Sequence, residues 1–327
     1  MPDNGNLFCS FLSQHDDSSW TQVIDELAPA IHQVDRRATR IWFAFFPVKL
    51  YRALAEAPNP EEKALSLQLK GKYRLADQVD SSAEFLYGHR FWPTVKRQVA
   101  VCAVSGAVPS SLAGQIREVA QRIAAELKVD SSLVIGITAV AFGTLQQVGL
   151  DLFKQPPAPD TYGKNWNRSP DRIVADRQKD DGQGLLGFLK TVDKEFTVTF
   201  RECQPDSTFK IVNLQDVTMA ATQDKRPHHL RDQRCMPGEG PIPVECRTST
   251  CGTCWVGVLS PTEKISPPGQ REHDRWVYFG YEGFTGEKDS PIRLACQLKA
   301  SGNITIVIPP WHGMIGKLNG QGENGAA

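Results

Sequence analysis

Hydrophobic and polar residues recur with the period of an α-helix over the first 155 positions. The clearest stretch is "SSLAGQIREVAQRIAAEL" at 110–127, where apolar residues return every three or four positions and charges lie between them. Ser110 or Ser111 stands where a helix cap is needed, and Asp130 is placed to cap the next helix. Together with helical patterns in 18–40, 47–68 and 81–105, this stretch predicts an all-α domain over residues 1–155.

The hydrophobic period changes to two between residues 187 and 312. Apolar residues occupy every second position in "EFTVTFRE" at 195–202, and "NITIVIP" at 303–309 repeats the pattern. Asp216 is placed to cap one short helix over 214–224. Further apolar runs predict strands at 209–214, 255–259 and 292–296. The expected fold class is therefore α+β, with the all-α domain followed by a domain built on a small mixed sheet.

Two segments lack any periodic apolar pattern. Residues 156–186 are rich in proline, glycine and charge, and such a composition cannot bury enough apolar surface to offset its ordering entropy. We therefore expect a linker at 156–186. The glycine-rich residues 313–327 are expected to form a disordered tail for the same reason.

A stretch of twenty residues without a charge, 131–150, raises the question of a membrane helix. Glycine, threonine and glutamine interrupt it, and no cluster of lysine or arginine flanks it. We expect a helix buried in a bundle and no membrane association, with a spanning helix kept as the alternative. The first twenty residues show no basic region followed by an apolar one, so we expect a cytoplasmic protein.

The charges point to no nucleic-acid partner. The 327 residues contain 37 basic and 37 acidic side chains, so the formal net charge is zero. Residues 193–310 alone carry 14 basic against 15 acidic side chains, which gives no strong acidic field either. We expect partner docking to depend on shape more than on long-range attraction.

Four of the eight cysteines have a spacing that indicates metal chemistry. Cys246, Cys251 and Cys254 form C-x4-C-x2-C, and Cys296 follows 41 residues later. This is the spacing of plant-type [2Fe–2S] ligation, in which four thiolates hold two bridged irons. A zinc site is the alternative, although its ligands usually come as two short pairs. A c-type haem would need a histidine where Trp255 stands.

The residues around these cysteines resemble the plant-type [2Fe–2S] ferredoxin family. The resemblance lies in "CRTSTCGTCWVGVL" at 246–259 and "IRLACQLKASGNITIVIP" at 292–309. It implies a β-grasp domain in which Cys246, Cys251, Cys254 and Cys296 ligate the cluster. The resemblance also matches Arg247 to the usual neighbour of the first ligand, and Gly252 to the loop glycine.

Two features depart from that family. Ser249 stands where many members have glycine, so a positive φ there would strain the loop. The gap before Cys296 is longer than in short ferredoxins, and it leaves "REHDRWVYFGYEGFTGEKDSP" at 271–291 as an insertion. We expect this insertion to cover the sheet, with partner docking as the alternative.

No nucleotide-binding motif accompanies the cysteines. We therefore expect an electron carrier or an oxidoreductase subunit, not a self-contained enzyme, working between a reductase and an electron acceptor. The helical domain is expected to dock a redox partner. Alternatives are a cluster that serves as a redox sensor or structural staple, and a fixed iron–sulfur subunit of a larger oxidoreductase. The remaining cysteines and the histidines His32 and His89 are expected to be ordinary structural residues.

Overall fold

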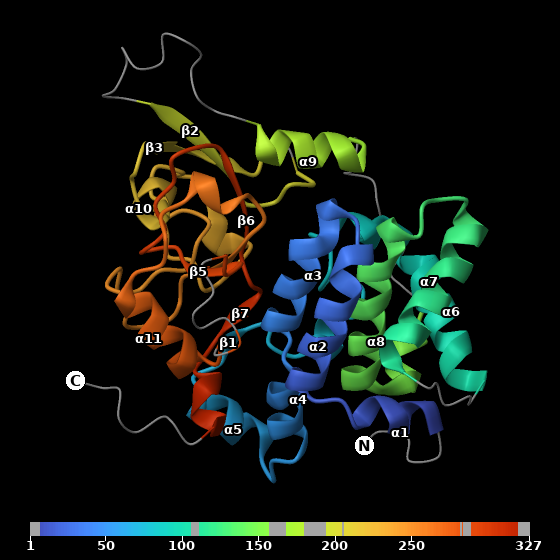
Figure 1. Cartoon of the computed structure of the whole chain (residues 1–327). Helices are drawn as coiled ribbons and strands as arrows, with labels where there is room; N and C mark the ends of the chain where they lie inside the picture. The colour runs from blue at the N-terminus through green and yellow to red at the C-terminus, as the bar shows by residue number, and fades with distance from the viewer. Residues whose placement is uncertain are drawn as a thin grey trace. The chain divides into compact units, whose positions relative to one another are not determined.

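The chain divides into two compact units in the computed structural model (Figure 1). The helical unit comprises residues 1–60 and 74–171, and the sheet unit comprises 61–73 and 172–327. The structure describes residues 7–105, 111–156, 168–179, 194–204, 206–281, 283 and 289–319. All named strands of the described residues lie in the sheet unit and most of the helices lie in the helical unit, which is consistent with the α+β class.

The described residues of the helical unit form seven α-helices that follow one another along the chain. Their bounds are α1 Leu7–Ser13, α2 Asp17–Leu27, α3 Gln33–Phe45, α4 Val48–Ala55, α6 Trp92–Ser105, α7 Leu112–Leu127 and α8 Ser132–Phe153. The hydroxyl of Ser111 accepts the amide of Gly114 at 3.1 Å, so it caps α7 as expected. Asp130 accepts the amide of Ser132 at 2.8 Å at the start of α8. In Figure 1, α3, α6 and α7 surround α8.

Helix α8 is the core of the helical unit. It is long and apolar enough to cross a membrane, but 78% of its most apolar stretch is buried by other parts of the protein. Its polar side chains are satisfied inside the unit: Gln147 donates to the carbonyl of Phe46 at 2.8 Å, and Thr138 to that of Val134. Gly136 lets α3 approach closely, because a Cβ there would lie 2.5 Å from the hydroxyl of Thr39. The expectation of a buried helix is therefore confirmed.

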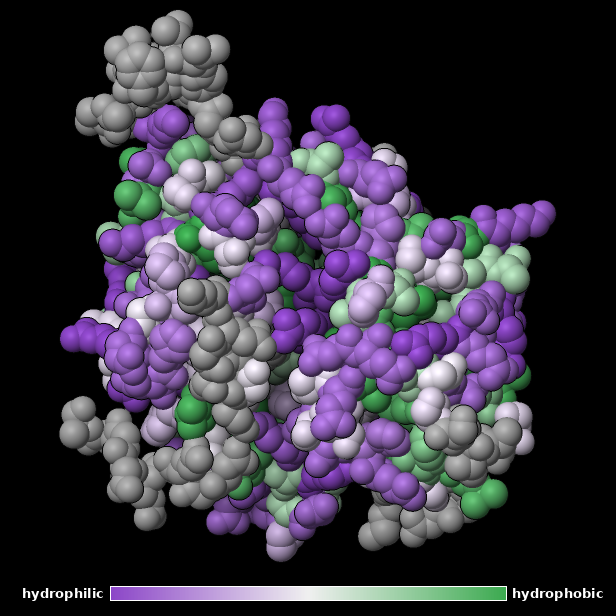
Figure 2. Space-filling view, in the orientation of Figure 1, coloured by the Kyte–Doolittle hydropathy of each residue, from purple (hydrophilic) through white to green (hydrophobic). Residues whose placement is uncertain are grey.

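The visible surface is of mixed character. In Figure 2, green hydrophobic residues lie in small groups between purple hydrophilic ones. Helix α8 adds little to these hydrophobic surface groups, because most of its apolar side chains are buried.

His89 is a buried, neutral histidine of the helical unit. Its side chain is 3% exposed, and Nε2 lies 2.8 Å from the carbonyl oxygen of Asp80. Burial lowers the pKa of His89 to about 4, because the charged ring would lose its hydration. The folded state therefore keeps His89 neutral at pH values where the unfolded chain already binds a proton.

We expect the free energy of unfolding to fall as the pH drops below about 6.5, by about 3 kcal/mol when pH 4 is reached. The folded pKa of His89 lies below the unfolded one, so the stabilisation is complete above the unfolded value and is lost on acidification. Urea unfolding of wild type and His89→Gln at neutral and acidic pH measures this. A difference between the two proteins that does not change with pH would contradict it.

The sheet unit contains a five-stranded mixed sheet with the order β3-β2-β6-β4-β5. The strands are β2 Glu195–Thr199, β3 Thr208–Val212, β4 Trp255–Val258, β5 Ile292–Leu294 and β6 Ile304–Val307. Strands β2 and β6 pair in parallel at the centre, with Val198 opposite Ile304, and the other pairs are antiparallel. All five strands were expected, β2 and β6 from the two-residue period and the other three from short apolar runs.

Helix α10, Val217–Ala221, follows the β2–β3 hairpin and buries its apolar side. Asp216 accepts the amide of Met219 at 3.0 Å, so the expected cap is confirmed. Helix α11, Gln270–Phe279, lies in the segment identified as an insertion.

The sheet unit also takes in chain from outside the expected boundaries. Helix α5, Pro60–Ser66, leads into strand β1, Lys70–Gly71, which pairs with β7, Trp311–His312. Residues 61–73 lie in the expected all-α domain but pack with the sheet unit. Two-residue strands carry no hydrophobic period, so sequence patterns cannot reveal this pairing.

The expected linker and tail both contain structure. Helix α9, Pro170–Gln178, lies within 156–186, and its Arg177 forms a buried ion pair with Glu202 of the sheet unit. In the expected tail, a 3₁₀ helix over Ile315–Asn319 buries Ile315. The remaining parts of those two ranges, 157–167, 180–186 and 320–327, lie outside the described residues.

Candidate metal centre

Strand pairing brings the two most distant cysteines together. Cys254 immediately precedes β4, and one residue separates the end of β5 from Cys296. The two strands are antiparallel, with Trp255 opposite Leu294, and the amide of Ala295 donates to the carbonyl of Cys254 at 2.9 Å. The sheet therefore closes the 41-residue gap in the sequence.

The four expected ligands meet as two contacting pairs of free thiols. Sγ of Cys246 accepts the amide of Cys251 at 3.3 Å, and Cys254 and Cys296 are close enough to shift each other's pKa. The pairs also interact electrostatically, Cys251 with Cys254 and Cys246 with Cys296. All four thiols expected from the sequence are thus gathered at one end of the β4–β5 pair.

The loop between Cys246 and Cys254 is wound in a left-handed sense at three positions. Arg247, Ser249 and Gly252 have φ values of 57°, 63° and 65°. The expectation that Ser249 would strain the loop is confirmed, since a side chain in this conformation costs about 1–2 kcal/mol. These three left-handed residues turn loop amides toward the cysteine sulfur atoms.

Backbone amides of this loop point at sulfur atoms. The amides of Thr248 and Cys251 donate to Sγ of Cys246 at 3.4 and 3.3 Å. The amide of Ser249 lies close enough to Cys296 to lower the pKa of that thiol. Hydrogen bonds to ligand sulfur stabilise negative charge and raise the reduction potential of an iron–sulfur cluster.

The hydroxyl of Thr253 lies between the loop and a thiol. It accepts the amide of Glu245 at 3.2 Å and lies 3.2 Å from Sγ of Cys251, to which it can donate. Glu245 in turn pairs with Lys70 of β1 at 2.9 Å. The start of the cluster loop is therefore tied to the segment 61–73.

Gly252 is required for a second reason besides its φ. A Cβ at this position would lie 2.2 Å from the ring of Phe279, the last residue of α11. No ring atom can give way by that much without moving the end of α11. Gly238 also has a positive φ, of 77°, but a Cβ there would meet nothing within 4 Å.

Gly252→Ala should therefore destabilise the sheet unit more than Gly238→Ala. In both variants an alanine must adopt the left-handed backbone conformation, which costs about 1–2 kcal/mol. Only Gly252→Ala adds an overpacking cost of about 1–3 kcal/mol. Chemical unfolding of the two variants, followed by tryptophan fluorescence, measures the difference. Equal losses would show that Phe279 does not confine the loop.

The two thiols within each pair have unequal acidities. Burial alone would raise the pKa of Cys246, but hydrogen bonds from Thr248 and Cys251 outweigh it and lower that pKa to about 6. The hydrogen bond to Cys296 raises the pKa of Cys254 well above its usual value, and burial adds to the effect. The same bond lowers the pKa of Cys296. In each pair one thiol therefore has a raised pKa and the other a lowered pKa, and metal binding must release the protons of both.

The arrangement in pairs bears on which metal fits. Within the described residues, no three or more His, Cys, Asp or Glu side chains converge as they would around one metal ion. A tetrahedral zinc site needs four ligands around one ion, whereas a two-iron cluster takes its four thiolates in two pairs. The donors here, thiols with amides directed at sulfur, are of the kind that iron–sulfur clusters use.

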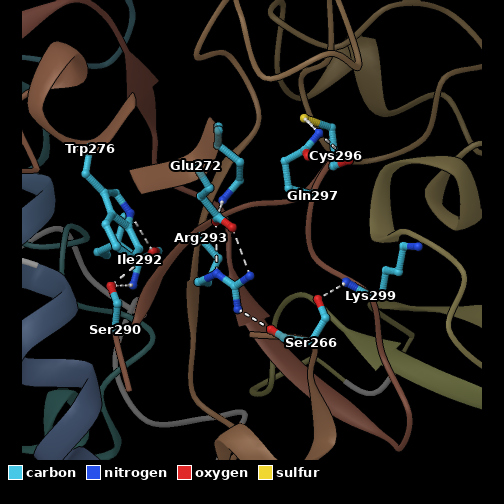
Figure 3. A network of polar contacts seen from close by, with 10 residues as sticks. Ser266, Glu272, Trp276, Ser290, Ile292, Arg293, Cys296, Gln297 and Lys299 are labelled. Carbon is cyan, nitrogen blue, oxygen red and sulfur yellow. Dashed lines mark hydrogen bonds and ion pairs between the residues drawn. The ribbon is translucent and has the colours of Figure 1, made fainter. Parts of the chain in front are cut away.

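A buried ion pair fixes the strand that carries Cys296. The carboxylate of Glu272 in α11 accepts two hydrogen bonds from the guanidinium of Arg293 in β5, each 2.9 Å long (Figure 3). Glu272 also accepts the amide of Leu294 at 2.6 Å, and Arg293 donates to the carbonyl of Ser266 at 2.8 Å. Both side chains are at most 1% exposed.

Helix α11 thus covers the edge strand of the sheet. Besides the ion pair, the indole of Trp276 donates to the carbonyl of Ile292 at 3.1 Å (Figure 3). An edge strand covered in this way is protected from pairing with other chains. The contacts agree with the expectation that the 271–291 insertion covers the sheet.

The other residues considered from the sequence have structural roles. Cys235 is buried and donates to the carbonyl of Pro241 at 3.3 Å, apart from the four ligands. His32 lies 3.2 Å from Asp171 and accepts the amide of Val34 at the start of α3. Trp255 is buried and packs edge-on against aromatic rings of the same unit.

Sequence patterns did not reveal Glu272, Arg293 and Phe279 as parts of the site. Arg293 carried a usable signal, because a charged residue within the apolar run "IRLAC" must find a buried partner if the strand is covered on both faces. Nothing in the sequence identifies Glu272 as that partner. Phe279 could be found only from the packing around Gly252.

Comparisons with known proteins give one partial similarity. A segment of 57 residues, 17% of this chain, is 37% identical to a ferredoxin of Bacillus thermotolerans. The segment spans 40% of the length of that ferredoxin. No protein-family model matches the chain, and no solved structure matches it. The similarity relates part of this chain to a ferredoxin.

Proposed function

We propose that this protein carries a [2Fe–2S] cluster on Cys246, Cys251, Cys254 and Cys296 and transfers single electrons. The observation that carries the proposal is the convergence of these four thiols in two pairs on one loop and one strand end, with loop amides directed at their sulfurs. The cluster, when bound, would supply reversible one-electron chemistry.

The sheet supports a β-grasp domain of the plant ferredoxin type. Its first and last strands, β2 and β6, are parallel neighbours at the centre, and the helix α10 follows the first hairpin. This order is the one that the resemblance implies. The similarity to a bacterial ferredoxin supports the same proposal.

The protein's own residues would tune and shield the cluster. Cys254 and Cys296 are buried, and Trp255 and Phe279 exclude water on their side. Cys246 and Cys251 are only partly buried, so electrons would enter and leave at their edge of the site. Amides and the hydroxyl of Thr253 would stabilise the added negative charge on reduction.

The proposed partners are a reductase and an electron acceptor, with the cytoplasm as the expected compartment. The helical unit would dock one of these partners and raise its local concentration at the cluster. A redox sensor, a structural staple and a fixed subunit of a larger oxidoreductase are the alternative roles. They differ from a carrier in whether reduction is reversible without loss of structure, and in whether the native protein is part of a complex.

A potentiometric titration of the full chain tests the carrier role. We expect a reversible one-electron transition near the plant-type value of about −400 mV, because an all-thiolate site carries more negative charge than one with two histidines. Loss of the cluster on reduction would favour the staple, and a positive midpoint would exclude the proposed ligand set. Size-exclusion chromatography of the native protein separates a free carrier from a fixed subunit.

A further inference from the structure

Helix α6 of the helical unit is apolar on two sides. Its inner side is buried and includes Val95, Val99 and Cys102. Its outer side still presents Val101 and Val104, which are 58% and 61% exposed. A helix that is apolar all round is normally covered on all sides.

The neighbouring helix α7 shows what an ordinary surface helix of this unit is like. Its buried side is apolar, and its exposed positions include Glu118, Gln121, Arg122 and Glu126. The outer side of α6 departs from this pattern, since Arg97 is the one charged residue among its exposed positions Pro93, Arg97, Val101, Val104 and Ser105.

The exposed side of α6 lines a groove of about 380 Å³ together with the end of α8. Ala100, Val101 and Val104 form one end of its lining, and Arg97 and Lys154 are at the other. The basic end is held together because Lys96, beside Arg97, donates to the carbonyl of Gln155, beside Lys154, at 2.8 Å. The apolar and basic ends are about 10 Å apart, the rise of seven helical residues from Arg97 to Val104.

The basic end of the groove contains a cation that no described carboxylate neutralises. Lys96 is buried and committed to Asp80 at 2.6 Å. Arg97 pairs with Glu126, but both side chains are largely exposed, so this pair is weak and can exchange. No described carboxylate pairs with Lys154.

Charge and shape decide among the occupants of this groove. A second copy docked through the same groove would set Arg97 and Lys154 against another Arg97 and Lys154, and the groove lining contains no acidic residue. A lipid surface would meet a concave groove with one unpaired cation, whereas membrane-binding helices present a broad apolar face flanked by many basic residues. A helix with an apolar stripe and an acidic residue complements both ends.

We propose that this groove binds an amphipathic helix of a partner protein, with apolar side chains against Val101 and Val104 and a carboxylate against Lys154. The proposal rests on the proposed function in taking that partner to be a redox partner, and it specifies where the helical unit holds it. The carboxylate lies about two helical turns from the apolar anchors.

Two fluorescent helical peptides of about 18 residues, long enough to form helix, serve as probes. Both carry a leucine stripe; one has glutamates two turns from its centre and the other has lysines there. Fluorescence anisotropy with the full chain, with and without cluster, measures binding. Because the readout needs no cluster, failure of this proposal is distinguishable from failure of the cluster assignment, which absorption reports.

We expect the glutamate peptide to bind and the lysine peptide to bind at least about tenfold more weakly. The double variant Val101→Asp, Val104→Asp should bind the glutamate peptide about tenfold or more weakly than wild type does. Lys154→Glu should reverse the preference between the two peptides. Val212→Asp, at an exposed valine of the sheet unit, is the matched control and should change nothing.

The proposal is overturned if neither peptide binds, if both bind wild type equally, or if the double variant binds as wild type does. Binding to phosphatidylglycerol vesicles that the double variant abolishes, without peptide binding, would instead assign the groove to a lipid surface. Circular dichroism of each variant shows that the helices are intact.

Discussion

Cys254→Ser should abolish the visible absorption of the purified protein, and the same change at Cys246, Cys251 or Cys296 should remove or destabilise the cluster. A serine hydroxyl stays protonated at neutral pH and is a poor iron ligand, so it cannot replace a cysteine thiolate. The thiols also lie in pairs with amides directed at sulfur. The effect should be largest at Cys254, because it is the most buried of the four and no solvent species can replace it.

Cys235→Ser is the matched control for this series. Cys235 is also buried in the sheet unit, and burial raises its pKa to about 11, so it is a neutral thiol that donates to a carbonyl. Serine can make the same hydrogen bond. Absorption spectra and iron content should be unchanged in Cys235→Ser, and loss of colour in this variant would mean that the ligand set has been misassigned.

Glu272→Ala should cost about 3–5 kcal/mol of the sheet unit's stability, because it leaves the guanidinium of Arg293 buried without its counter-charge. The amide of Leu294 would lose its acceptor as well. Since β5 leads directly to Cys296, the variant should also release its cluster faster than wild type. Chemical unfolding and the decay of absorption measure the two effects.

Glu26→Ala provides the comparison with an exposed ion pair. Glu26 and Arg117 lie 2.7 Å apart, but both are largely in contact with water. Its loss should cost less than about 1 kcal/mol. Similar losses in Glu272→Ala and Glu26→Ala would mean that the buried pair does not hold β5 in place.

Much of the fold was predictable from local patterns. The β2 strand alternates apolar and polar residues, β6 has isoleucine at every second position, and the α7 helix repeats its apolar residues at three and four, so their type follows from period alone. The four proposed ligands were singled out because a cluster loop constrains cysteine spacing, and strain at Ser249 was expected because a serine stands in place of glycine.

The remainder depends on contacts between residues distant in sequence. Strand β1 is two residues long and pairs with β7 some 240 residues later, which no local pattern encodes. Helix α9 has one buried apolar residue, Ile173, and is held through Arg177, so its composition reads as a linker. The Glu272–Arg293 pair could not be inferred, because several other acidic residues lie within reach in the sequence.

The central claim is tested most directly by analysis of the full chain purified without oxygen. We expect about two iron and two sulfide per chain, a red-brown colour, and, after reduction by one electron, an electron paramagnetic resonance signal of a single unpaired spin. Stoichiometric zinc with no visible absorption and no such signal would contradict the assignment of the four cysteines to a [2Fe–2S] cluster.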